Sequence, residues 1–194
     1  MKKHAGKRLY ITGIPTGGKS YLAKKLAKDL GGIAVILDNY RETLVKDETC
    51  EPWVNFYLNK NEKQYYSETS PEDQWKNLEQ QSEAFWPRFL EKIHSYADET
   101  KPVIFECVNM LPHLVSKDLN FPGIVLIGNS YEEILERIIQ DPRWGNTKEL
   151  QEMEAYSFFN IERPQYRREG ELFNLSVFNN ADEAYETAKK LLEN

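Results

Sequence analysis

A glycine-rich segment near residue 15 constrains the fold of this chain more than any other feature of the sequence. In order, the segment contains Gly13, Ile14, Pro15, Thr16, Gly17, Gly18, Lys19 and Ser20. A short apolar run at 8–12 precedes it, and apolar residues recur at helical spacing after it, from Ser20 to Leu30. A tight turn that joins a buried strand to a helix is typical of the first unit of a parallel α/β sheet. We therefore expect an α/β fold that begins with this turn.

The same segment has the composition of a phosphate-binding loop. Its spacing of Gly, four residues, and then Gly-Lys-Ser is the P-loop pattern. The glycines allow successive backbone N–H groups to surround a phosphate, Lys19 adds a positive charge, and the Ser20 hydroxyl is a ligand for Mg²⁺. The helix that begins near Ser20 points the positive end of its dipole at the anion. We therefore expect the residues from Gly13 to Tyr21 to bind ATP with Mg²⁺, and Lys19 also to act in catalysis.

The rest of the chain alternates between apolar runs typical of strands and patterns typical of helices. Strands are expected at 8–12, 33–37, 103–105, 124–127 and 175–178, with the run at 33–37 buried on both faces. Helices are expected at 20–30, from Pro71 to about Ile93, and at 131–140, 147–163 and 181–192. Residues 43–70 are polar and aromatic, and predict an irregular or partly helical insertion. Because helices separate the strands, the sheet should be parallel and covered on both faces.

Three parts of the sequence together resemble the P-loop small-molecule and nucleotide kinases. They are Gly13 to Ser20, Asp38 after the second strand, and the run Val103-Ile104-Phe105-Glu106-Cys107-Val108. The stretch 104–112 is further similar to the Glu-Gly-Val…Pro segment of 2-phosphoglycerate-kinase-like and zeta-toxin-like members, with Cys107 in place of the glycine. The resemblance implies a three-layer αβα sandwich around a five-stranded parallel sheet of order 2-3-1-4-5. It also implies a single domain over 1–194, with a substrate-side insertion at about 43–96 and a mobile lid at about 137–168.

Two acidic residues follow the expected second and third strands. Asp38 comes after the run at 33–37, at the carboxyl edge where open α/β sheets bind ligands. Its carboxylate could orient an acceptor hydroxyl or accept its proton, and the alternative is a capping role in a turn. Glu106 ends the third strand, where P-loop proteins place an acid near Mg²⁺. We expect Glu106 to contact the metal or the substrate, and the alternative is a surface acid at a strand end.

Three arginines are candidates for contacts with anionic groups. Arg41 follows Asp38 by three residues and suits a carboxylate or phosphate on the acceptor, and a solvated surface arginine is the alternative. Arg137 and Arg143 lie around the helix break at 141–146. Both are expected to bring positive charge over the transferring phosphate when the lid closes. The alternative for them is charge balance with neighbouring glutamates on an exposed helix.

A P-loop with an acid after each of the next two strands favours a kinase. We expect it to transfer the γ-phosphate of ATP to a hydroxyl group of a small molecule. Arginines near Asp38 are scarce, which favours a hydroxyl acceptor, and a nucleoside or nucleotide monophosphate kinase is an alternative. A nucleotide-binding regulatory NTPase is a second alternative, because the aromatic insertion at 43–70 suits partner docking as well as closure over an acceptor.

Composition and charge argue against several other classes of protein. The net charge of −6 is not that of a nucleic-acid-coating protein. The apolar run after the basic start at 1–8 is too short for a signal peptide, and no stretch is long enough to span a membrane. Cys50 and Cys107 are therefore expected to be free thiols in a reducing cytoplasm. We expect a monomer or homodimer whose partners are a nucleoside triphosphate and a small-molecule acceptor.

Overall fold

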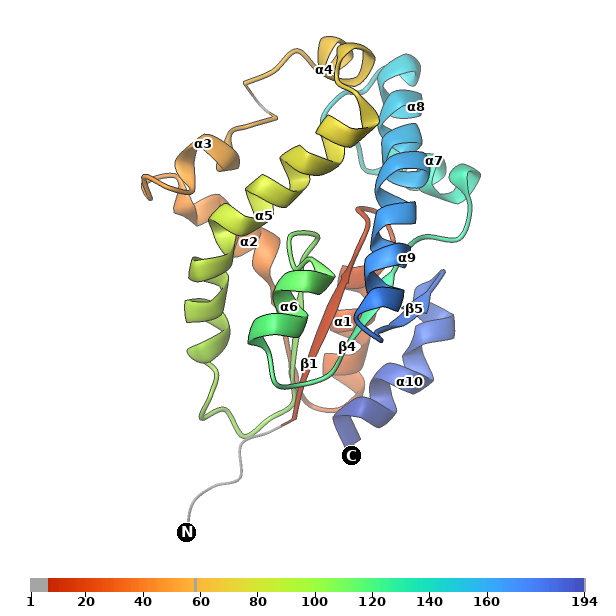
Figure 1. Ribbon diagram of the computed structural model, residues 1–194. Coiled ribbons are helices and arrows are strands. Elements are labelled where there is room, and N and C mark those ends of the chain that lie inside the picture. Colours follow the sequence, from red (N-terminus) through yellow and green to blue (C-terminus); the bar gives the residue numbers. More distant parts are fainter. Residues whose placement is uncertain (1–6, 58, 194) are drawn as a thin grey trace.

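The computed structural model describes residues 7–57 and 59–193. Residues 1–6, 58 and 194 of the expected domain, with most of its basic start, lie outside the described residues. The strands are β1 (Arg8–Gly13), β2 (Ile33–Ile36), β3 (Val103–Glu106), β4 (Gly123–Leu126) and β5 (Ser176–Phe178). The helices are α1 (Lys19–Asp29), α2 (Leu37–Arg41), the 3-10 helix η1 (Glu42–Leu44), α3 (Glu51–Val54), α4 (Glu62–Glu68), α5 (Pro71–His94), α6 (Pro112–Asp118), α7 (Tyr131–Gln140), α8 (Lys148–Tyr156), the π-helix η2 (Ser157–Glu162), α9 (Arg163–Leu172) and α10 (Ala181–Glu193). Figure 1 shows their arrangement around the sheet.

The strands form one parallel sheet in the order β2-β3-β1-β4-β5, which confirms the predicted order. Ile11 of β1 is paired with Glu106 of β3 on one side and with Ile124 of β4 on the other. The glycine-rich segment therefore leaves the middle of the sheet at its carboxyl edge. The expectation that residues 33–37 are buried on both faces was wrong. Because β2 is an edge strand, only Val35 of this strand is fully buried.

Alternate residues of the strands pack against helices on opposite faces of the sheet. Ile11 belongs to one buried cluster with Leu22 of α1 and Ala188 of α10. Its neighbour Tyr10 belongs to a second cluster, with Phe85 of α5 and other residues of α5, α6 and α9. This alternation follows from the two-residue period of a strand. Both faces are covered, as Figure 1 shows, so the three-layer αβα sandwich is confirmed.

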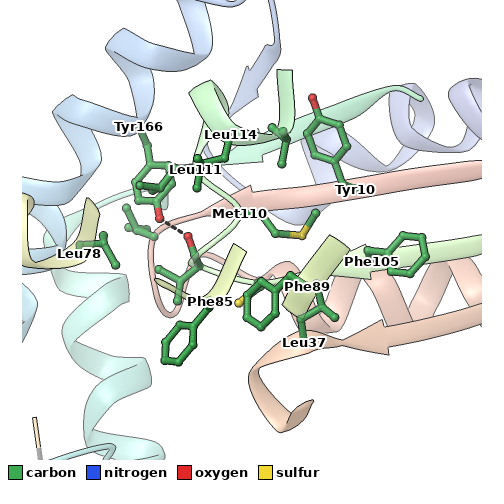
Figure 2. Packing of buried hydrophobic residues seen from close by; sticks show 14 of the residues in the cluster. Tyr10, Leu37, Leu78, Phe85, Phe89, Phe105, Met110, Leu111, Leu114 and Tyr166 are labelled. Atoms are coloured by element: carbon green, nitrogen blue, oxygen red, sulfur yellow. Dashed lines mark hydrogen bonds between the residues drawn. The ribbon is translucent and has the colours of Figure 1, made fainter. Parts of the chain in front are cut away.

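Helix α5 is the longest element, and it covers much of one face. It begins as expected at Pro71, and the Ser70 hydroxyl oxygen accepts a hydrogen bond from the N–H of Asp73. Figure 2 shows the core beneath this helix, where the rings of Phe85 and Phe89 stack at 5.8 Å. On the other side of this core, the hydroxyl of Tyr166 donates a hydrogen bond to the backbone carbonyl oxygen of Val108, which lies just after β3. The segment that follows β3 is therefore held between α5 and α9.

The helix expected over 147–163 continues further than predicted. The structure has three consecutive helical segments there, α8, η2 and α9, which end at Leu172. The predicted end at Arg163 was wrong, because the helical backbone continues from η2 directly into α9. Pro164 lies in the first turn of α9, directly after the π-helix η2. The helix expected at 131–140 is confirmed as α7.

The two cysteines are free, as expected, and both are buried. Burial in particular raises the pKa of the Cys107 thiol well above its ordinary value, so this group is a thiol and not a thiolate. Across the described ranges, no helix has the length and apolar character needed to cross a bilayer.

Candidate functional site

The glycine-rich segment turns sharply at the carboxyl edge of the sheet. Gly13 has a φ angle of +129°, and a Cβ atom there would lie 1.8 Å from the carbonyl oxygen of Leu126. Thr16 and Gly18 also have positive φ angles, +58° and +93°, before α1 begins at Lys19. A backbone that alternates in this way directs successive N–H groups towards one point. The geometry suits a phosphate group above the N-terminus of α1.

Lys19 is held inside this loop. Its side chain is only 6% exposed, and its Nζ donates to the carbonyl oxygen of Ile14 at 2.7 Å. Burial lowers the pKa of the ammonium group, and the carboxylates of Glu106 and Asp38 oppose this shift. A neutral carbonyl compensates a buried positive charge only in part. A phosphate group would supply the negative charge that this position lacks.

Ser20 and Glu106 meet between the loop and the end of β3. The Ser20 hydroxyl donates to Oε1 of Glu106 at 2.7 Å, and Glu106 is fully buried, so the surface-acid alternative is wrong. The other oxygen, Oε2, is buried without a hydrogen-bond partner. Burial raises the pKa of this carboxyl, and the charge of Lys19 opposes the shift. A hydroxyl beside an unpartnered carboxylate oxygen is a donor set that fits Mg²⁺.

Asp38 lies in the first turn of α2, just beyond β2. Its Oδ1 is 3.0 Å from Nη1 of Arg41, but this oxygen is buried and accepts no hydrogen bond. Nη1 of Arg41 donates instead to Oδ1 of Asn109 at 2.9 Å, and the amide of Asn109 is bonded to Gln81 and Ser82 of α5. Arg41 is thus fixed by the protein. The Oδ1 atom of Asp38 keeps its capacity to accept a hydrogen bond from a ligand.

Two arginines reach the P-loop from the expected lid. Arg137, in the last turn of α7, donates to the carbonyl oxygen of Thr16 and to the carboxylate of Glu133. Arg143 lies in the break after α7, and it is close enough for its positive charge to lower the pKa of both Lys19 and Glu106. Positive charge from the lid therefore already lies close to the proposed position of the phosphates.

A cleft of about 940 Å³ at the carboxyl edge of the sheet brings most of the predicted site residues together. Its lining includes Thr16, Gly18, Lys19, Ser20, Tyr21, Asp38, Glu106, Arg137 and Arg143. Tyr21 is 58% exposed there. The other predicted P-loop residues, Gly13, Ile14, Pro15 and Gly17, are buried beneath the loop surface. Arg41 is not part of the lining and faces Asn109, so its contact with an acceptor stays a prediction.

A second group of residues lies beside Arg143, and the sequence did not indicate its acidic members as site residues. This acid–aromatic cluster consists of Tyr57, Tyr65, Tyr66, Trp144, Glu62, Glu154 and Glu162. The positive charge of Arg143 favours the ionised forms of Glu154 and Glu162 and so opposes any rise of their pKa values. The charge of Lys19 has the same effect on Glu162. Burial raises the pKa of Glu154 to about 7 and that of Glu162 to about 8. No motif in the sequence contains these acids.

The cluster joins the helix break at 141–146 to the insertion. The ring of Trp144 lies 5.5 to 5.8 Å from the rings of the three tyrosines of the cluster. The N–H of Gly145 donates to the carboxylate of Glu62 in α4. A Cβ atom on Gly145 would lie 2.2 Å from Oε2 of Glu62, so a glycine allows this close approach. The expected lid is therefore in contact with the insertion.

Solved structures share this fold. Shikimate kinase from Acinetobacter baumannii matches 97% of this chain and 92% of its own length, with 15% identity and a TM-score of 0.54. Shikimate kinase from Bacteroides thetaiotaomicron matches 97% and 99%, with 16% identity and a TM-score of 0.53. No family model and no curated protein matches the sequence. The closer similarity to 2-phosphoglycerate-kinase-like and zeta-toxin-like proteins stays a prediction, and what the comparisons show is that this chain has the fold of these P-loop kinases.

Proposed function

We propose that this protein is an ATP-dependent phosphotransferase that moves the γ-phosphate to a hydroxyl group of a small molecule. One observation carries the proposal: a P-loop, an acid from each of two neighbouring strand ends and two arginines after β4 converge on one cleft of about 940 Å³. A cleft of this volume has room for a nucleotide and a small acceptor. The shikimate kinase of Acinetobacter baumannii, which has the same fold, was solved in complex with shikimate.

The P-loop binds the phosphates of the nucleotide. Backbone N–H groups from Gly13 to Ser20 surround the β-phosphate, and the dipole of α1 adds to their attraction. Lys19 exchanges its hydrogen bond to the Ile14 carbonyl for contacts with the β- and γ-phosphates. The phosphates then replace a neutral carbonyl as the partner of the buried ammonium group. Burial lowers the pKa of Lys19 because the charged form is poorly compensated, and the same burial therefore favours binding of a negatively charged phosphate.

Ser20 and Glu106 are the residues that would hold Mg²⁺. Bound Mg²⁺ supplies positive charge next to the phosphate oxygens. The Ser20 hydroxyl gives up its hydrogen bond to Glu106, which leaves both oxygens of Glu106 available to the metal or to its water ligands.

Asp38 positions the acceptor. Its Oδ1, which is ion-paired with Arg41 but accepts no hydrogen bond in the protein, accepts one from the acceptor hydroxyl. The Asp38 carboxylate then receives the proton as the acceptor oxygen attacks the γ-phosphorus. Arg41 lies 3.0 Å away and holds the carboxylate in place. Arg137 and Arg143 stabilise the charge on the transferring phosphate, with Arg137 leaving the Thr16 carbonyl to do so.

A thermal-shift screen tests this function. Saturation with ATP and Mg²⁺ should raise the melting temperature, since a ligand at a hundred times its Kd adds about 2.7 kcal/mol of stability. Sugars, nucleosides and hydroxy acids are then added to the protein with a non-hydrolysable ATP analogue, and a true acceptor adds a further shift. Phosphorus NMR of the same mixtures with ATP identifies the phosphorylated product. The Asp38→Asn variant should keep the nucleotide shift and lose product formation.

The screen also distinguishes the alternatives. A product whose new phosphate is bonded to an existing phosphate would support a nucleotide monophosphate kinase. A nucleotide shift without any product from the library would support a regulatory NTPase. A protein that shows no shift with ATP and Mg²⁺ would contradict the proposed function as a whole.

A further inference from the structure

Three acids of the acid–aromatic cluster, Glu62, Glu154 and Glu162, each have a buried carboxyl oxygen without a hydrogen-bond partner, and the last two lie near Arg143. Glu154 is only 3% exposed, and its Oε2 atom accepts no hydrogen bond. The Oε2 atom of Glu162 is likewise buried and has no partner. Buried carboxylates in proteins are normally paired with a cation or with hydrogen-bond donors, because an isolated charge is costly to remove from water. Both sites are therefore incomplete without a ligand.

The helix geometry brings these two carboxylates together. Glu154 lies in the last turn of α8, and Glu162 is the last residue of the π-helix η2. Eight residues of a regular α-helix would leave the two side chains about 80° apart around the axis. A π-helix turns less per residue, which brings Glu162 back towards the face of Glu154. The charge of Glu154 acts on Glu162, which is consistent with this arrangement.

These carboxylates share their cations with the phosphate site. In the described part of the chain, Asp38 is paired with Arg41, and Glu133 with Arg137. The cations that act on Glu154 and Glu162 are instead Arg143, which acts on both, and Lys19, which acts on Glu162. The proposed function assigns Lys19 and Arg143 to the nucleotide. Nucleotide binding therefore leaves the two carboxylates without compensation.

Aromatic rings surround the same position. The charges of Glu154 and Glu162 act on the hydroxyl of Tyr66, and that of Glu162 acts on the hydroxyl of Tyr57. Both rings lie within 5.6 Å of the ring of Trp144. Aromatic faces attract cations, and more strongly when the contact is removed from water. Carboxylates and aromatic rings together form an environment suited to a positively charged group.

We propose that the acceptor carries a protonated amino group near its reacting hydroxyl, and that Glu154 and Glu162 bind this ammonium group after the nucleotide has engaged Arg143. The proposal rests on the proposed phosphotransferase function and names the substrate class for its acceptor site. An ammonium group has three N–H donors, enough to satisfy both unpartnered oxygens. Burial raises the pKa of both carboxyls, and a bound ammonium group would lower both pKa values again by favouring the ionised forms.

Matched acceptor probes test the proposal. Protein saturated with AMP-PNP and Mg²⁺ is titrated with pairs that differ in one amino group: 2-amino-1,3-propanediol and glycerol, 2-aminoethanol and ethylene glycol, and glucosamine and glucose. We expect the amine of at least one pair to bind about tenfold more tightly than its neutral partner, as measured by calorimetry and thermal shift. The double variant Glu154→Gln, Glu162→Gln should bind AMP-PNP and lose this preference. Equal binding within every pair, no binding by any amine, or a preference that survives in the double variant would each overturn the proposal.

A double-mutant cycle tests the shared arginine without any acceptor. Replacing both carboxylates by amides frees Arg143 for the nucleotide, so the double variant should bind AMP-PNP and Mg²⁺ about fivefold more tightly than wild type. In the Arg143→Met background, the same two replacements should change this affinity by less than about twofold. A gain of equal size in both backgrounds would contradict the sharing of Arg143. Failure of wild type to bind AMP-PNP would instead contradict the proposed function, so the two failures are distinguishable.

Discussion

The charge of Arg143 acts on both the P-loop and the acid–aromatic cluster, but the charged groups of these two regions are held in different ways. In the P-loop, the Lys19 ammonium and the Ser20 hydroxyl each have a hydrogen-bond partner in the protein, at 2.7 Å in both cases. In the cluster, Glu154 and Glu162 each have a buried oxygen with no partner. We therefore infer that the P-loop is pre-organised for the ligand that we propose for it, a nucleotide polyphosphate. The cluster is completed only by its ligand, and this is where we place the specificity for the acceptor.

The two regions also differ in how tightly the atoms around their glycines are held. At Gly13 a side chain would meet the backbone of β4, which is fixed in the sheet. At Gly145 a side chain would meet the end of the Glu62 side chain, which can move. We expect mutations of the P-loop to have large effects because its neighbours cannot adjust, and mutations of the cluster to have smaller effects that depend on ligand and pH.

The largest effect is expected for Lys19→Ala. This change removes the ammonium group that contacts the phosphates, so nucleotide affinity and phosphotransfer should fall by about a thousandfold. Calorimetry with AMP-PNP and Mg²⁺ measures the first quantity, and initial rates with an acceptor from the screen measure the second. Thermal unfolding should show no loss of stability, since the variant no longer buries a charge.

Lys24→Ala is the matched control for this variant. Lys24 lies on the same helix, α1, but is exposed and outside the cleft lining. It should leave affinity and rate within about twofold of wild type, as is usual for a surface substitution. Phosphotransfer by the Lys19 variant at the rate of the Lys24 variant would contradict the assignment of the P-loop to catalysis.

A smaller but still large effect is expected for Gly13→Ala, measured as stability. The positive φ angle of +129° and the 1.8 Å approach to the Leu126 carbonyl oxygen should together cost about 3 kcal/mol or more. The melting temperature should fall by about 10 °C. Gly31→Ala is the control, because Gly31 also has a positive φ angle, +63°, but no atom within 4 Å. It should cost only the backbone strain, about 1 kcal/mol. Equal losses in the two variants would show that crowding at Gly13 is unimportant.

The sequence predicted the P-loop side of the molecule well, for physical reasons. The residues that we propose bind phosphate are consecutive because such a loop binds through its own backbone, so a single short pattern contains all of them. The sheet order followed from the resemblance to P-loop kinases, and the structure confirms it. Asp38 and Glu106 were found because each stands directly after an apolar strand, at the edge where the cleft lies.

The acceptor side was not predictable in the same way. Tyr57, Trp144 and Glu162 are far apart in the sequence and meet only through tertiary packing. The position of Glu162 also depends on the π-helix η2, which has no clear sequence pattern and changes the spacing of the residues that follow. The same irregularity accounts for the error at the end of the helix expected over 147–163.

A pH-dependent effect of intermediate size is expected for Glu154→Gln. The folded-state pKa of about 7 is above the ordinary value of 4.5, so the folded protein binds this proton more tightly than the unfolded chain does. The contribution of Glu154 to stability is therefore favourable at low pH and is lost as pH rises from about 4 to 8. At pH 8.5 the amide variant should be more stable than wild type by about 2 to 3 kcal/mol, and at pH 5 the two should be nearly equal.

Urea unfolding at the two pH values measures this difference. Glu152→Gln serves as the control for loss of a carboxylate from the same helix, because its side chain is 44% exposed. A gain of stability in the Glu154 variant that is the same at pH 5 and pH 8.5 would contradict burial of an unpaired carboxyl at this position.

The smallest effect on stability is expected for Gly145→Ala, which completes the comparison with Gly13. The backbone of Gly145 is not in the left-handed region, and the atom that a Cβ would meet is the end of the Glu62 side chain. This side chain can turn away, so the melting temperature should change by less than about 3 °C. The hydrogen bond from the Gly145 N–H to Glu62 would be lost, however, and the break at 141–146 should separate from α4. Hydrogen exchange should therefore become faster at 141–146 while it is unchanged in β1 and β3. Loss of protection in the strands as well would mean that the cluster supports the whole fold and is not a separate, adaptable part of the site.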